Sequence, residues 1–485
     1  MRQIPWGITM ILLLLVWLIF IVIALSFVRH EPDQQTNQRI SQALRDLQYL
    51  HQQREEITNL VINLYLIRFL TVMSLVCPYI PLSKLKILEK PPLEYEKLRR
   101  RLQSGIEEMW FFISSQVKLL QRKSEGKSPI IAEHLKTILN EGIEHKRALL
   151  NDVFQLAEVD GYSAWRLKEA VELSDLVQRR ITHLQNPPDC NEAKKLVCKL
   201  NKGCGYGCQL HHAVYCLIVA YGTQRTLILQ SKGWKYNRKG WEQVFKPVSE
   251  TCTTVTEPVH KWPGTFNSPT VLLGIVDSVT PRPPFIPLVV PKDLAERIER
   301  LHGQPSVWWV GQFLKYLLRP QPATTDLLKD AANKFKFQRP IVGVHIRRTD
   351  KVGTEAAFHS SDEYMLHVED YYKQLAFNST KPITKRIYLA SDDDKVFSEI
   401  RSRYPDYEVL GDSKIAKSAA LSTRYSGNSL NGIVMDIYFL SQTDYLVCTF
   451  SSQVCRVAYE IMQSLHHDAS TRFRSLDDIY YFGGQ

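Results

Sequence analysis

The sequence predicts an α/β fold, with a parallel sheet in the C-terminal part of the chain, a helical region before it and a membrane anchor at the N-terminus. Three observations lead to this prediction. Strand-like and helix-like segments alternate from residue 341 onward, which is typical of parallel sheets. Apolar residues recur at helical spacing between 93 and 123. The run Trp6–Val28 contains no charged residue.

Composition excludes several classes of protein. The chain has 485 residues, of which 44% are hydrophobic and 23% are charged. These values are ordinary for folded proteins and exclude wholesale disorder, a collagen-like repeat and a small disulfide scaffold. Lys and Arg outnumber Asp and Glu by 61 to 50, which suits an anionic ligand or surface. The sequence has no basic run with interleaved aromatic residues, so nucleic acid is not an expected partner.

The uncharged N-terminal run predicts an uncleaved signal anchor. At about 1.5 Å per residue it is long enough to cross a hydrocarbon core of ~30 Å, whereas a cleaved signal peptide usually has a shorter apolar run. We therefore expect a cytoplasmic tail and transmembrane anchor over 1–33 and a polar, helix-compatible stem over 34–92. A second apolar stretch, Leu60–Val76, has three interpretations: a second span, a buried or interfacial segment, or an artefact of the gene model.

The cysteines predict an oxidising compartment. Eight of the nine fall into two clusters, and such clustering beyond a membrane anchor is typical of disulfides in a lumen. These eight are Cys190, Cys198, Cys204, Cys208, Cys216, Cys252, Cys448 and Cys455, which leaves Cys77 over. The alternative is a zinc site made by Cys204, Cys208, His211, His212 and Cys216. Disulfides and anchor together predict a single-pass type II membrane protein of the secretory pathway.

Residues 93–186 are expected to form a helical or coiled-coil region. Between 98 and 120 the apolar side chains are spaced by three and four residues, which predicts one long amphipathic helix. Two roles fit its apolar face: a coiled-coil dimer seam, or packing on the body of the same chain. Further helices are expected at 130–157 and 164–184, before a proline pair breaks the pattern.

A disulfide-stabilised, open α/β domain is expected over 187–340. Glycines alternate in a tight loop at 203–207, and a helix pattern at 209–221 and a strand pattern at 226–229 follow. Glycines at this spacing let the backbone approach a ligand closely, although the adjacent disulfides are an equally good reason for the loop.

Residues 341–485 are expected to form a Rossmann-type domain. Strands are predicted at Ile341–Ile346, Arg386–Ala390 and Tyr445–Phe450, and helices at about 362–376, 394–403 and 452–464. Carboxyl ends of parallel strands meet at one edge of the sheet, where a ligand crevice forms. Functional side chains are therefore expected at these strand ends.

The densest polar cluster follows the first of these strands and runs from His345 to Glu355. Two adjacent arginines, Arg347 and Arg348, are suited to clamping a diphosphate with bidentate hydrogen bonds. Adjacent residues of a strand point to opposite faces, so Arg347 is expected to reach the ligand and Arg348 to form a structural ion pair. His345 shares a face with Arg347. A solvated, charged turn is the alternative.

The other two strand ends also carry polar residues. The second ends in three aspartates at 392–394, whose Asp-x-Asp pattern is known from divalent-metal sites; an arginine clamp in place of the metal, or a helix N-terminal carboxylate, are the alternatives. The third ends at 451–453, where the start of the following helix suits a phosphate or a sugar hydroxyl, or a plain serine cap. Asp436 is either a buried specificity residue or a satisfied core carboxylate.

Four stretches, at 344–359, 204–212, 221–229 and 447–460, carry a close resemblance to a known family. They resemble the alpha-1,6-fucosyltransferases of the Golgi, and the resemblance covers roughly 93–485. It implies a GT-B-like glycosyltransferase that moves L-fucose from GDP-fucose to the 6-hydroxyl of the innermost Asn-linked GlcNAc of N-glycans. The family works with inversion and without a metal or cofactor. The anchor then implies a Golgi membrane protein with a lumenal catalytic part.

The resemblance also implies roles for individual residues. Arg347 would hold the donor diphosphate, and Glu355, assisted by Lys351, would deprotonate the acceptor hydroxyl. The donor site would be completed by His345, Gly205, Tyr206, Asp436, Ser452 and Gln453, with Asp436 reading the guanine. The acceptor glycan would be bound by Lys202 and Asp277. Structural roles would fall to Arg348, Asp350, Asp392 and Asp393.

Disulfides, partners and alternatives follow from the same resemblance. The family's disulfides would be Cys190–Cys252, Cys198–Cys216, Cys204–Cys208 and Cys448–Cys455. Expected partners are GDP-fucose, an N-glycan acceptor with an exposed GlcNAc, the Golgi membrane and a second copy of the chain. The family continues beyond the position of residue 485 into an SH3-like domain. The alternative function is therefore a truncated, catalytically silent isoform that binds GDP-fucose or dimerises with the full-length enzyme; a metal-dependent lumenal glycosyltransferase is a third possibility.

Overall fold

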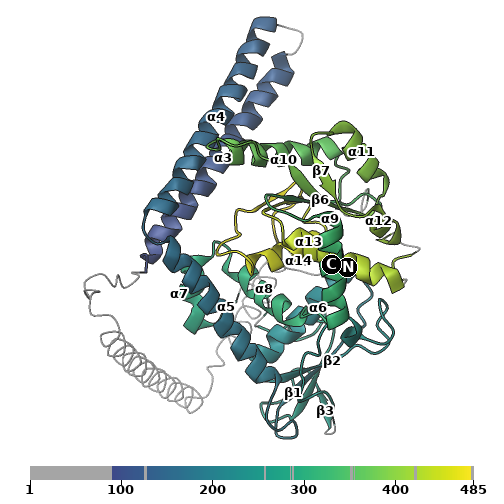
Figure 1. Cartoon of the computed structure of the whole chain (residues 1–485). Coiled ribbons are helices and arrows are strands. Elements are labelled where there is room, and N and C mark those ends of the chain that lie inside the picture. Colours follow the sequence, from purple (N-terminus) through teal and green to yellow (C-terminus); the bar gives the residue numbers. More distant parts are fainter. Residues whose placement is uncertain are drawn as a thin grey trace, which may run out of the picture. The chain divides into compact units, whose positions relative to one another are not determined.

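Two parallel β-sheets, each accompanied by helices, form the core of the described part of the chain (Figure 1). The computed structural model describes residues 90–124, 128–255, 258–284, 286, 289–349, 353, 356–419, 423–425 and 427–481. These residues belong to the second of two units of the chain, Leu88–Gln485. The expected anchor, almost all of the expected stem and Cys77 lie outside the described residues.

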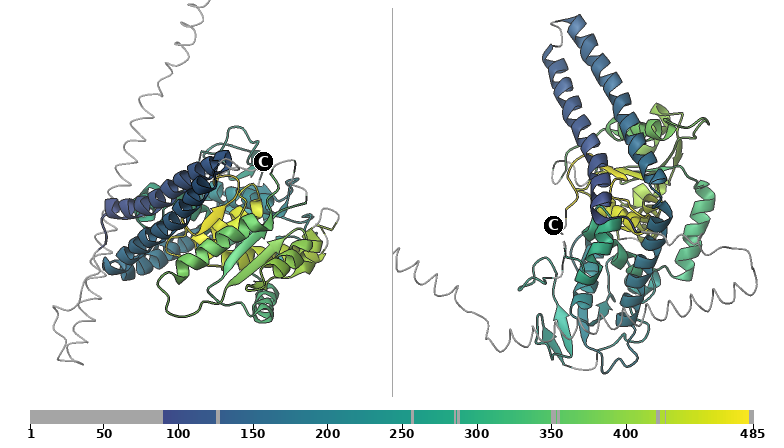
Figure 2. Two further views of the ribbon diagram at one scale, coloured as in Figure 1. Left: turned by 90° about the horizontal axis from the view of Figure 1, so that it is seen from above. Right: turned by 90° about the vertical axis from the view of Figure 1, so that its left-hand side faces the viewer.

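Helices α3 (Leu93–Ser124) and α4 (Pro129–Val159) form a long antiparallel hairpin that projects away from the sheets (Figures 1 and 2). The side chain of Ser128 caps α4 by accepting a hydrogen bond from a backbone N–H of its first turn, and Pro129 takes the first helical position. These local signals explain why the chain reverses here, and both predicted helices are confirmed.

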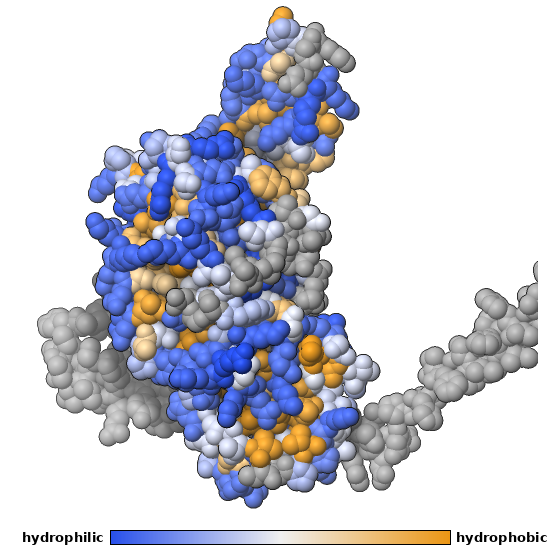
Figure 3. All heavy atoms as spheres, turned by 90° about the vertical axis from the view of Figure 1, so that its right-hand side faces the viewer, coloured by the Kyte–Doolittle hydropathy of each residue, from blue (hydrophilic) through white to orange (hydrophobic). Residues whose placement is uncertain are grey.

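The apolar face of α3 is only partly buried. Ile106 packs on Leu150 and Val153 of α4. Other large apolar side chains of α3 are exposed, among them Leu102 at 52% and Phe112 at 63%. Figure 3 shows hydrophobic side chains, in orange, among hydrophilic ones on the projecting hairpin. Packing within the described residues therefore does not cover this face.

Buried ion pairs hold the base of the hairpin to helix α5 (Ser163–Gln185). Arg166 of α5 donates from Nε to Oε1 of Glu96 at 2.8 Å, and its guanidinium also contacts Asp160. All three side chains are almost completely buried. Because a buried charge without a partner is costly, these contacts fix α3, α4 and α5 relative to one another.

The first sheet has the strand order β2-β1-β4-β3, and all of its strands are parallel. Its strands are β1 (Lys195–Lys199), β2 (Thr226–Gln230), β3 (Val259–Lys261) and β4 (Thr270–Leu273). Helix α6 (Tyr206–Gly222) connects β1 to β2 and is buried over most of its length. The helix was predicted to begin at 209, but it begins at Tyr206. Gly207 therefore lies in its first turn rather than in a loop.

Four disulfides stabilise the described residues. They join Cys190 to Cys252, Cys198 to Cys216, Cys204 to Cys208 and Cys448 to Cys455. This pairing confirms the one implied by the family resemblance. The zinc alternative is wrong, because all three of its sulfur atoms are in S–S bonds. His212 instead lies against the Cys198–Cys216 disulfide, with Nε2 3.4 Å from Sγ of Cys198.

Three α-helices that lie along the chain between the last strand of the first sheet and the first strand of the second were not predicted from the sequence. They are α7 (Lys292–Leu301), α8 (Pro305–Leu317) and α9 (Pro322–Phe335), and a short 3-10 helix, η2 (Trp241–Gln243), precedes them. Helix α8 is buried on nearly all sides, so it has little of the polar and apolar alternation that reveals a surface helix. No helix among the described residues is both long and apolar enough to cross a bilayer.

The second sheet has the strand order β7-β6-β5-β8-β9 and is also entirely parallel. Its strands are β5 (Val342–Ile346), β6 (Arg386–Ser391), β7 (Glu408–Leu410), β8 (Tyr445–Cys448) and β9 (Phe473–Ser475). Its helices are α10 (Ser361–Ala376), α11 (Lys395–Arg403), α12 (Ser413–Ala419), α13 (Gly427–Ser441) and α14 (Gln453–Gln463). The three predicted strands and the helices around them are confirmed.

Both faces of the second sheet are covered by helices, which explains its almost continuously apolar strands. Ile387 and Leu389 pack against α10 and α11 on one face. Tyr388 and Ala390 pack against α9, α13 and α14 on the other. This doubly covered parallel sheet confirms the α/β class, and it leaves the edge at the strand ends for polar side chains.

Candidate active site

The strand order of the second sheet defines where a ligand can bind. The chain proceeds from β5 to β6 and β7 on one side, and β8 then returns to the other side of β5. The topological switch point therefore lies between the carboxyl ends of β5 and β8, where open α/β sheets bind ligands. Arg347 follows β5, and Ser452 and Gln453 follow β8, so predicted residues from both segments stand at this point.

Asp392 organises the turn that follows β5. Its carboxylate accepts hydrogen bonds from the backbone N–H groups of Arg348 at 2.8 Å and Thr349 at 2.9 Å, and also from the Thr349 hydroxyl. Oδ2 of Asp392 lies 3.3 Å from Nη1 of Arg347. Burial raises the pKa of Asp392, but the Arg347 charge and these hydrogen bonds outweigh it and hold the pKa below its ordinary value. The carboxylate is therefore ionised and fixes the turn beneath Arg347.

Arg348 points to a different partner from Arg347. It donates from Nη1 to Oε2 of Glu399 on α11 at 2.7 Å, and its guanidinium lies 5.1 Å from the ring centroid of Phe358. Glu399 also accepts from the hydroxyl of Ser361. Arg348 thus ties the β5 turn to α10 and α11 rather than to the switch point.

His345 lies on the face of β5 that it shares with Tyr388 and Ala390 of β6. Burial, with a smaller contribution from the Arg347 charge, lowers the pKa of His345 to about 4. The ring is therefore neutral near pH 7. Its Nδ1 atom is buried and has no hydrogen-bond partner among the described residues, which leaves it available to a bound molecule.

The side chain of Asp477 holds the turn between β8 and α14 by hydrogen bonds to its backbone. Its Oδ1 atom accepts from the backbone N–H of Phe450 at 2.8 Å and of Ser451 at 3.4 Å. Ser452 is the N-cap residue of α14, yet among the described residues its hydroxyl caps none of the helix's own N–H groups. The turn is thus rigid, while the Ser452 hydroxyl and the start of the helix remain usable for an anion.

The two sheets meet at this turn through helix α6. A Cβ atom at Gly207, in the first turn of α6, would lie 2.8 Å from Cβ and 2.9 Å from the carbonyl carbon of Gln453. Helix α6 follows β1, and α14 follows β8, so the carboxyl edges of both sheets face one site. Only glycine permits this approach.

An aromatic cluster of the first sheet's domain surrounds Tyr206, the first residue of α6. Tyr206 packs on Trp234 and Tyr236, with ring centroids 6.0 and 5.3 Å away. Burial raises the pKa of Tyr236 to about 12, and the nearby Arg424 and Arg347 charges oppose this rise. Tyr236 was missed from the sequence because no local pattern marks it as close to Arg347. Tyr206 itself is buried in the cluster, and Gly205, the N-cap residue of α6, has open space around its Cα.

Lys202 and Asp277, the expected acceptor ligands, form an ion pair with each other. Lys202 follows β1 and Asp277 follows β4, and these two strands are neighbours in the first sheet. Gln209 orders the Lys202 loop by donating to the carbonyl oxygens of Lys202 at 3.0 Å and Cys204 at 2.7 Å. The pair therefore sits at the carboxyl edge of the first sheet.

Asp436 on α13 is a buried carboxyl group. It accepts a hydrogen bond from the Tyr388 hydroxyl at 2.9 Å. Burial raises the pKa of Asp436 to about 8; the Tyr388 hydrogen bond opposes the rise and the Asp412 charge adds to it. Near pH 7 the group is therefore mostly protonated. Its place beside Tyr388 puts it on the same face of the sheet as His345.

The remaining aspartates after β6 do not form a metal-binding set. Oδ1 of Asp393 accepts from the backbone N–H of Lys395 at 3.0 Å. Asp394 pairs with Lys417, Nζ to Oδ2 3.3 Å. Asp392 already contacts Arg347 and accepts hydrogen bonds from the two backbone N–H groups described above. The two carboxylates of the Asp-x-Asp pattern, Asp392 and Asp394, therefore have separate partners. Asp350, Lys351 and Glu355 lie outside the described residues.

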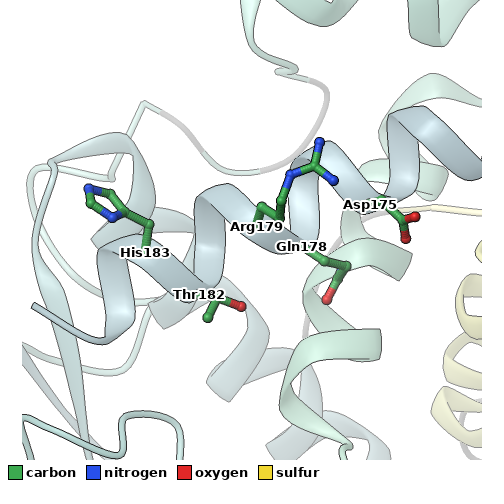
Figure 4. Close-up of a pocket in the computed structure, with 5 residues that line it drawn as sticks. All are labelled: Asp175, Gln178, Arg179, Thr182 and His183. Atoms are coloured by element: carbon green, nitrogen blue, oxygen red, sulfur yellow. The ribbon is translucent and has the colours of Figure 1, made fainter. Parts of the chain in front are cut away.

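A hollow of about 390 Å³ lies apart from these residues, along α5 (Figure 4). It is lined by Asp175, Gln178, Arg179, Thr182 and His183. All five belong to one helix, and the Gln178 amide already donates to the carbonyl oxygen of Gln312 at 2.9 Å. Among the described residues, none of those predicted for the site lines this hollow.

Comparison with known proteins places this arrangement in a family. A family model described as "Alpha-(1,6)-fucosyltransferase N- and catalytic domains" matches residues 80–481. An alpha-(1,6)-fucosyltransferase of Drosophila melanogaster is 59% identical over 399 residues, which cover 82% of this chain and 64% of the fly protein. One of Caenorhabditis elegans is 42% identical over 411 residues, covering 82% of this chain and 70% of the worm protein.

Solved structures of other fucosyltransferases are more distant. Fucosyltransferase NodZ from Bradyrhizobium is 13% identical, with a TM-score of 0.34, covering 55% of this chain and 92% of that chain. POFUT1 in complex with GDP-fucose is 15% identical, with a TM-score of 0.36, covering 60% of this chain and 99% of that chain. The assignment rests on the sequence matches, of which the first spans about two thirds of the relative's length. By these matches, the chain belongs to the alpha-(1,6)-fucosyltransferase family.

Proposed function

We propose that this protein transfers L-fucose from GDP-fucose to the 6-hydroxyl of the innermost Asn-linked GlcNAc of N-glycans. The observation that carries the proposal is that Arg347, Ser452 and Gln453 follow the two strands that flank the switch point of the second sheet, in a chain of this family. A cation beside a rigid helix N-terminus is suited to a diphosphate. The two parallel sheets with facing carboxyl edges support a GT-B-like arrangement.

The donor is held by groups from both sheets. Arg347, kept in place by Asp392, binds the diphosphate, and the Ser452 hydroxyl and the Gln453 amide contact phosphate and fucose. His345 and Asp436 line one face of the second sheet and bind the guanosine part, with Asp436 reading the guanine. Gly205 and Tyr206 cover the nucleotide from the first sheet.

The reaction is a single displacement at C1 of fucose. Glu355, assisted by Lys351, takes the proton from the acceptor hydroxyl, whose oxygen forms the new bond to C1. The bond from C1 to the phosphate oxygen breaks on the opposite face, so the configuration inverts. GDP leaves with the bonding electrons, and Arg347 stabilises the charge that develops on it. Lys202 and Asp277 bind the acceptor glycan at the edge of the first sheet.

The reaction proceeds without a metal ion. Arg347 supplies positive charge where other nucleotide-sugar sites use a divalent cation. The carboxylates that would hold such a cation are engaged with protein groups, Asp392 with Arg347 and Asp394 with Lys417. These pairings support the proposal, and activity in EDTA tests it.

The N-terminal parts of the chain support the proposed location and assembly. The uncharged run Trp6–Val28 supports a type II anchor in the Golgi membrane, with the catalytic part in the lumen. Four disulfides agree with an oxidising lumen. The exposed apolar side chains of α3 support a homodimer formed by the hairpin of α3 and α4.

The test is transfer by the whole chain, expressed in cells without endogenous core fucosylation and purified in detergent. GDP-fucose and a GlcNAc-terminated biantennary N-glycopeptide are supplied in EDTA, and product is read by mass. Fucose should appear on the innermost GlcNAc, and Glu355→Gln and Arg347→Ala should abolish it. GDP-fucose binding without transfer by the wild type would contradict the enzymatic proposal and favour a silent, donor-binding isoform. If the wild type shows no GDP-fucose binding and no transfer, both the enzymatic proposal and the silent, donor-binding alternative are contradicted.

A further inference from the structure

We propose that His211 is a positioning residue that orients Gln453 for the donor diphosphate, with Glu460 and Tyr480 holding His211 in place. The inference deepens the proposed function and rests on it. His211 lies on α6, in the first sheet's domain, whereas Gln453 and Glu460 lie on α14, in the second. The contact therefore joins the two domains beneath the donor site.

The geometry assigns a separate partner to each ring nitrogen of His211. Nδ1 lies 2.5 Å from Oε1 of Gln453. Nε2 lies 2.8 Å from Oε2 and 3.0 Å from Oε1 of Glu460. An amide oxygen and a carboxylate both accept hydrogen bonds, so each ring nitrogen of His211 faces an acceptor of its own.

Burial and a stacked neighbour hold the His211 ring in this orientation. His211 is 2% exposed and Glu460 is 1% exposed. The ring of Tyr215, one turn further along α6, stacks on His211 with an interplanar angle of 11°. The Tyr480 hydroxyl donates to Oε1 of Glu460, which fixes the carboxylate from the side of the C-terminal segment. A buried carboxylate with these partners is held far more rigidly than an exposed one.

The consequence for Gln453 is a fixed amide. Its oxygen is engaged by His211, and no described residue accepts from its NH₂ group, which is the part left to donate to a phosphate or a sugar oxygen. The close approach of Gly207 fixes the backbone of the same residue. A donor held in advance loses less conformational entropy when the ligand binds, so its contact is worth more.

Two near-isosteric variants separate the two contacts of His211. In His211→Asn the amide takes the place of Nδ1 and keeps the contact with Gln453. In His211→Gln it takes the place of Nε2 and keeps the contact with Glu460. If orientation of Gln453 is the role, His211→Gln loses about tenfold in GDP affinity while His211→Asn stays within about threefold, as expected for loss of one buried hydrogen bond.

The experiment measures Kd for GDP and for GMP by titration calorimetry with the whole chain. It compares the wild type with His211→Gln, His211→Asn, Gln453→Ala and the double variant His211→Gln/Gln453→Ala. The double variant should be no weaker than Gln453→Ala alone, because both substitutions remove the same contact. Since GMP lacks the second phosphate, its affinity should change little. His302→Ala, at another buried histidine that stacks on Trp308, controls for loss of stability alone.

Several results would overturn the inference. One is an equal loss of affinity for GDP and for GMP, and another is additive losses of GDP affinity in the double variant. The others are weaker GDP binding by His211→Asn than by His211→Gln, or His211 variants that bind GDP as tightly as the wild type does. Arg347→Ala is measured as well, to tell a wrong role for His211 from a wrong proposed function. If the wild type binds GDP and Arg347→Ala does not, the donor site stands and only the role of His211 is wrong. If the wild type binds no GDP, the proposed function is wrong as well.

Discussion

Nη1 of Arg347 lies 3.3 Å from Oδ2 of Asp392, at the carboxyl ends of two neighbouring parallel strands. The same carboxylate accepts from the backbone N–H groups of the two residues after Arg347. Asp392 therefore fixes both the charged group and the backbone of the turn that presents Arg347, although the strand-end pattern taken alone marks it only as one of three consecutive aspartates.

Asp392→Asn should weaken GDP binding strongly. The substitution removes the charge partner of Arg347 and turns one acceptor oxygen into a donor that faces backbone N–H groups. Breaking a buried ion pair costs about 3–5 kcal/mol, so we expect Kd for GDP to rise by at least about tenfold and the melting temperature to fall. The matched control is Asp394→Asn, because Asp394 is 40% exposed and its pair with Lys417 is worth little. Calorimetry and thermal unfolding check this, and equal effects of the two substitutions would contradict it.

GDP binding near pH 7 should release protons through Asp436. Burial raises the pKa of this group to about 8, so it is mostly protonated in the free protein. Guanine presents N–H donors, which favour the carboxylate form and so expel the proton. We expect up to about one proton released per GDP, seen as a binding enthalpy that differs between phosphate and Tris buffers. Asp436→Asn should lose this dependence; a wild-type enthalpy that is the same in both buffers would count against the guanine-reading role.

The same carboxyl group should make the protein less stable as pH rises. Its pKa is about 8 in the folded protein and about 3.9 in an unfolded chain, so the folded state binds the proton more tightly. The stabilisation is complete below about pH 4 and is lost progressively up to about pH 8. Relative to Asp436→Asn, the free energy of unfolding of the wild type should therefore fall between these values. Denaturant unfolding at several pH values tests this, and a constant difference between the two proteins would refute it.

Gly207→Ala should disturb the start of α14 and weaken GDP binding. The new methyl group would lie 2.8 Å from Cβ of Gln453 and 2.9 Å from its carbonyl carbon, so backbone has to move. We expect a loss of about tenfold or more in GDP affinity, since overpacking of this kind typically costs about 1–3 kcal/mol. Gly105→Ala on α3 is the control, because nothing lies within 4 Å of its added methyl group and alanine favours a helix. Unchanged GDP affinity in Gly207→Ala would show that α6 and α14 can separate freely.

Phe112→Glu should disrupt self-association. Phe112 is 63% exposed on α3, and a charge in an apolar dimer seam would be left without a partner. We expect the wild type to be dimeric in detergent and Phe112→Glu to be monomeric, as measured by light scattering. Leu366→Glu, at a residue of α10 with 60% exposure, should remain dimeric. A monomeric wild type, or a dimer unaffected by Phe112→Glu, would remove α3 as the interface.

Much of the fold could be predicted because its signals are local. The amphipathic period of 93–123, the turn residues and the apolar runs around 342–346 and 386–391 each act over a few residues. The unpredicted elements lack such signals. Helix α8 is buried on nearly every side, and strands β3 and β9 contain only three residues each. None of the three elements therefore shows a periodic pattern of polar and apolar residues.

The candidate site was only partly predictable from chemistry along the chain. The polar run after residue 344 and the Ser-Ser-Gln turn at 451–453 stand out because functional side chains directly follow buried strands. Tyr236, Glu460 and His211 do not stand out in the same way, since their partners are more than a hundred residues away. The ion pair between Lys202 and Asp277 could not be predicted either, because β1 and β4 were not predicted as neighbours.

The sequence by itself determined the α/β class, the cysteine-rich region, the strand ends that carry the polar residues and the family resemblance. These depend on local propensity and on which side chains follow which strand. Only the tertiary structure decided that β8 lies beside β5, that α6 meets α14 at Gly207, and that His211 reaches Gln453 and Glu460. The reason is that strand order and helix contacts arise from long-range packing, in which each side chain meets partners that its own neighbourhood in the sequence does not specify.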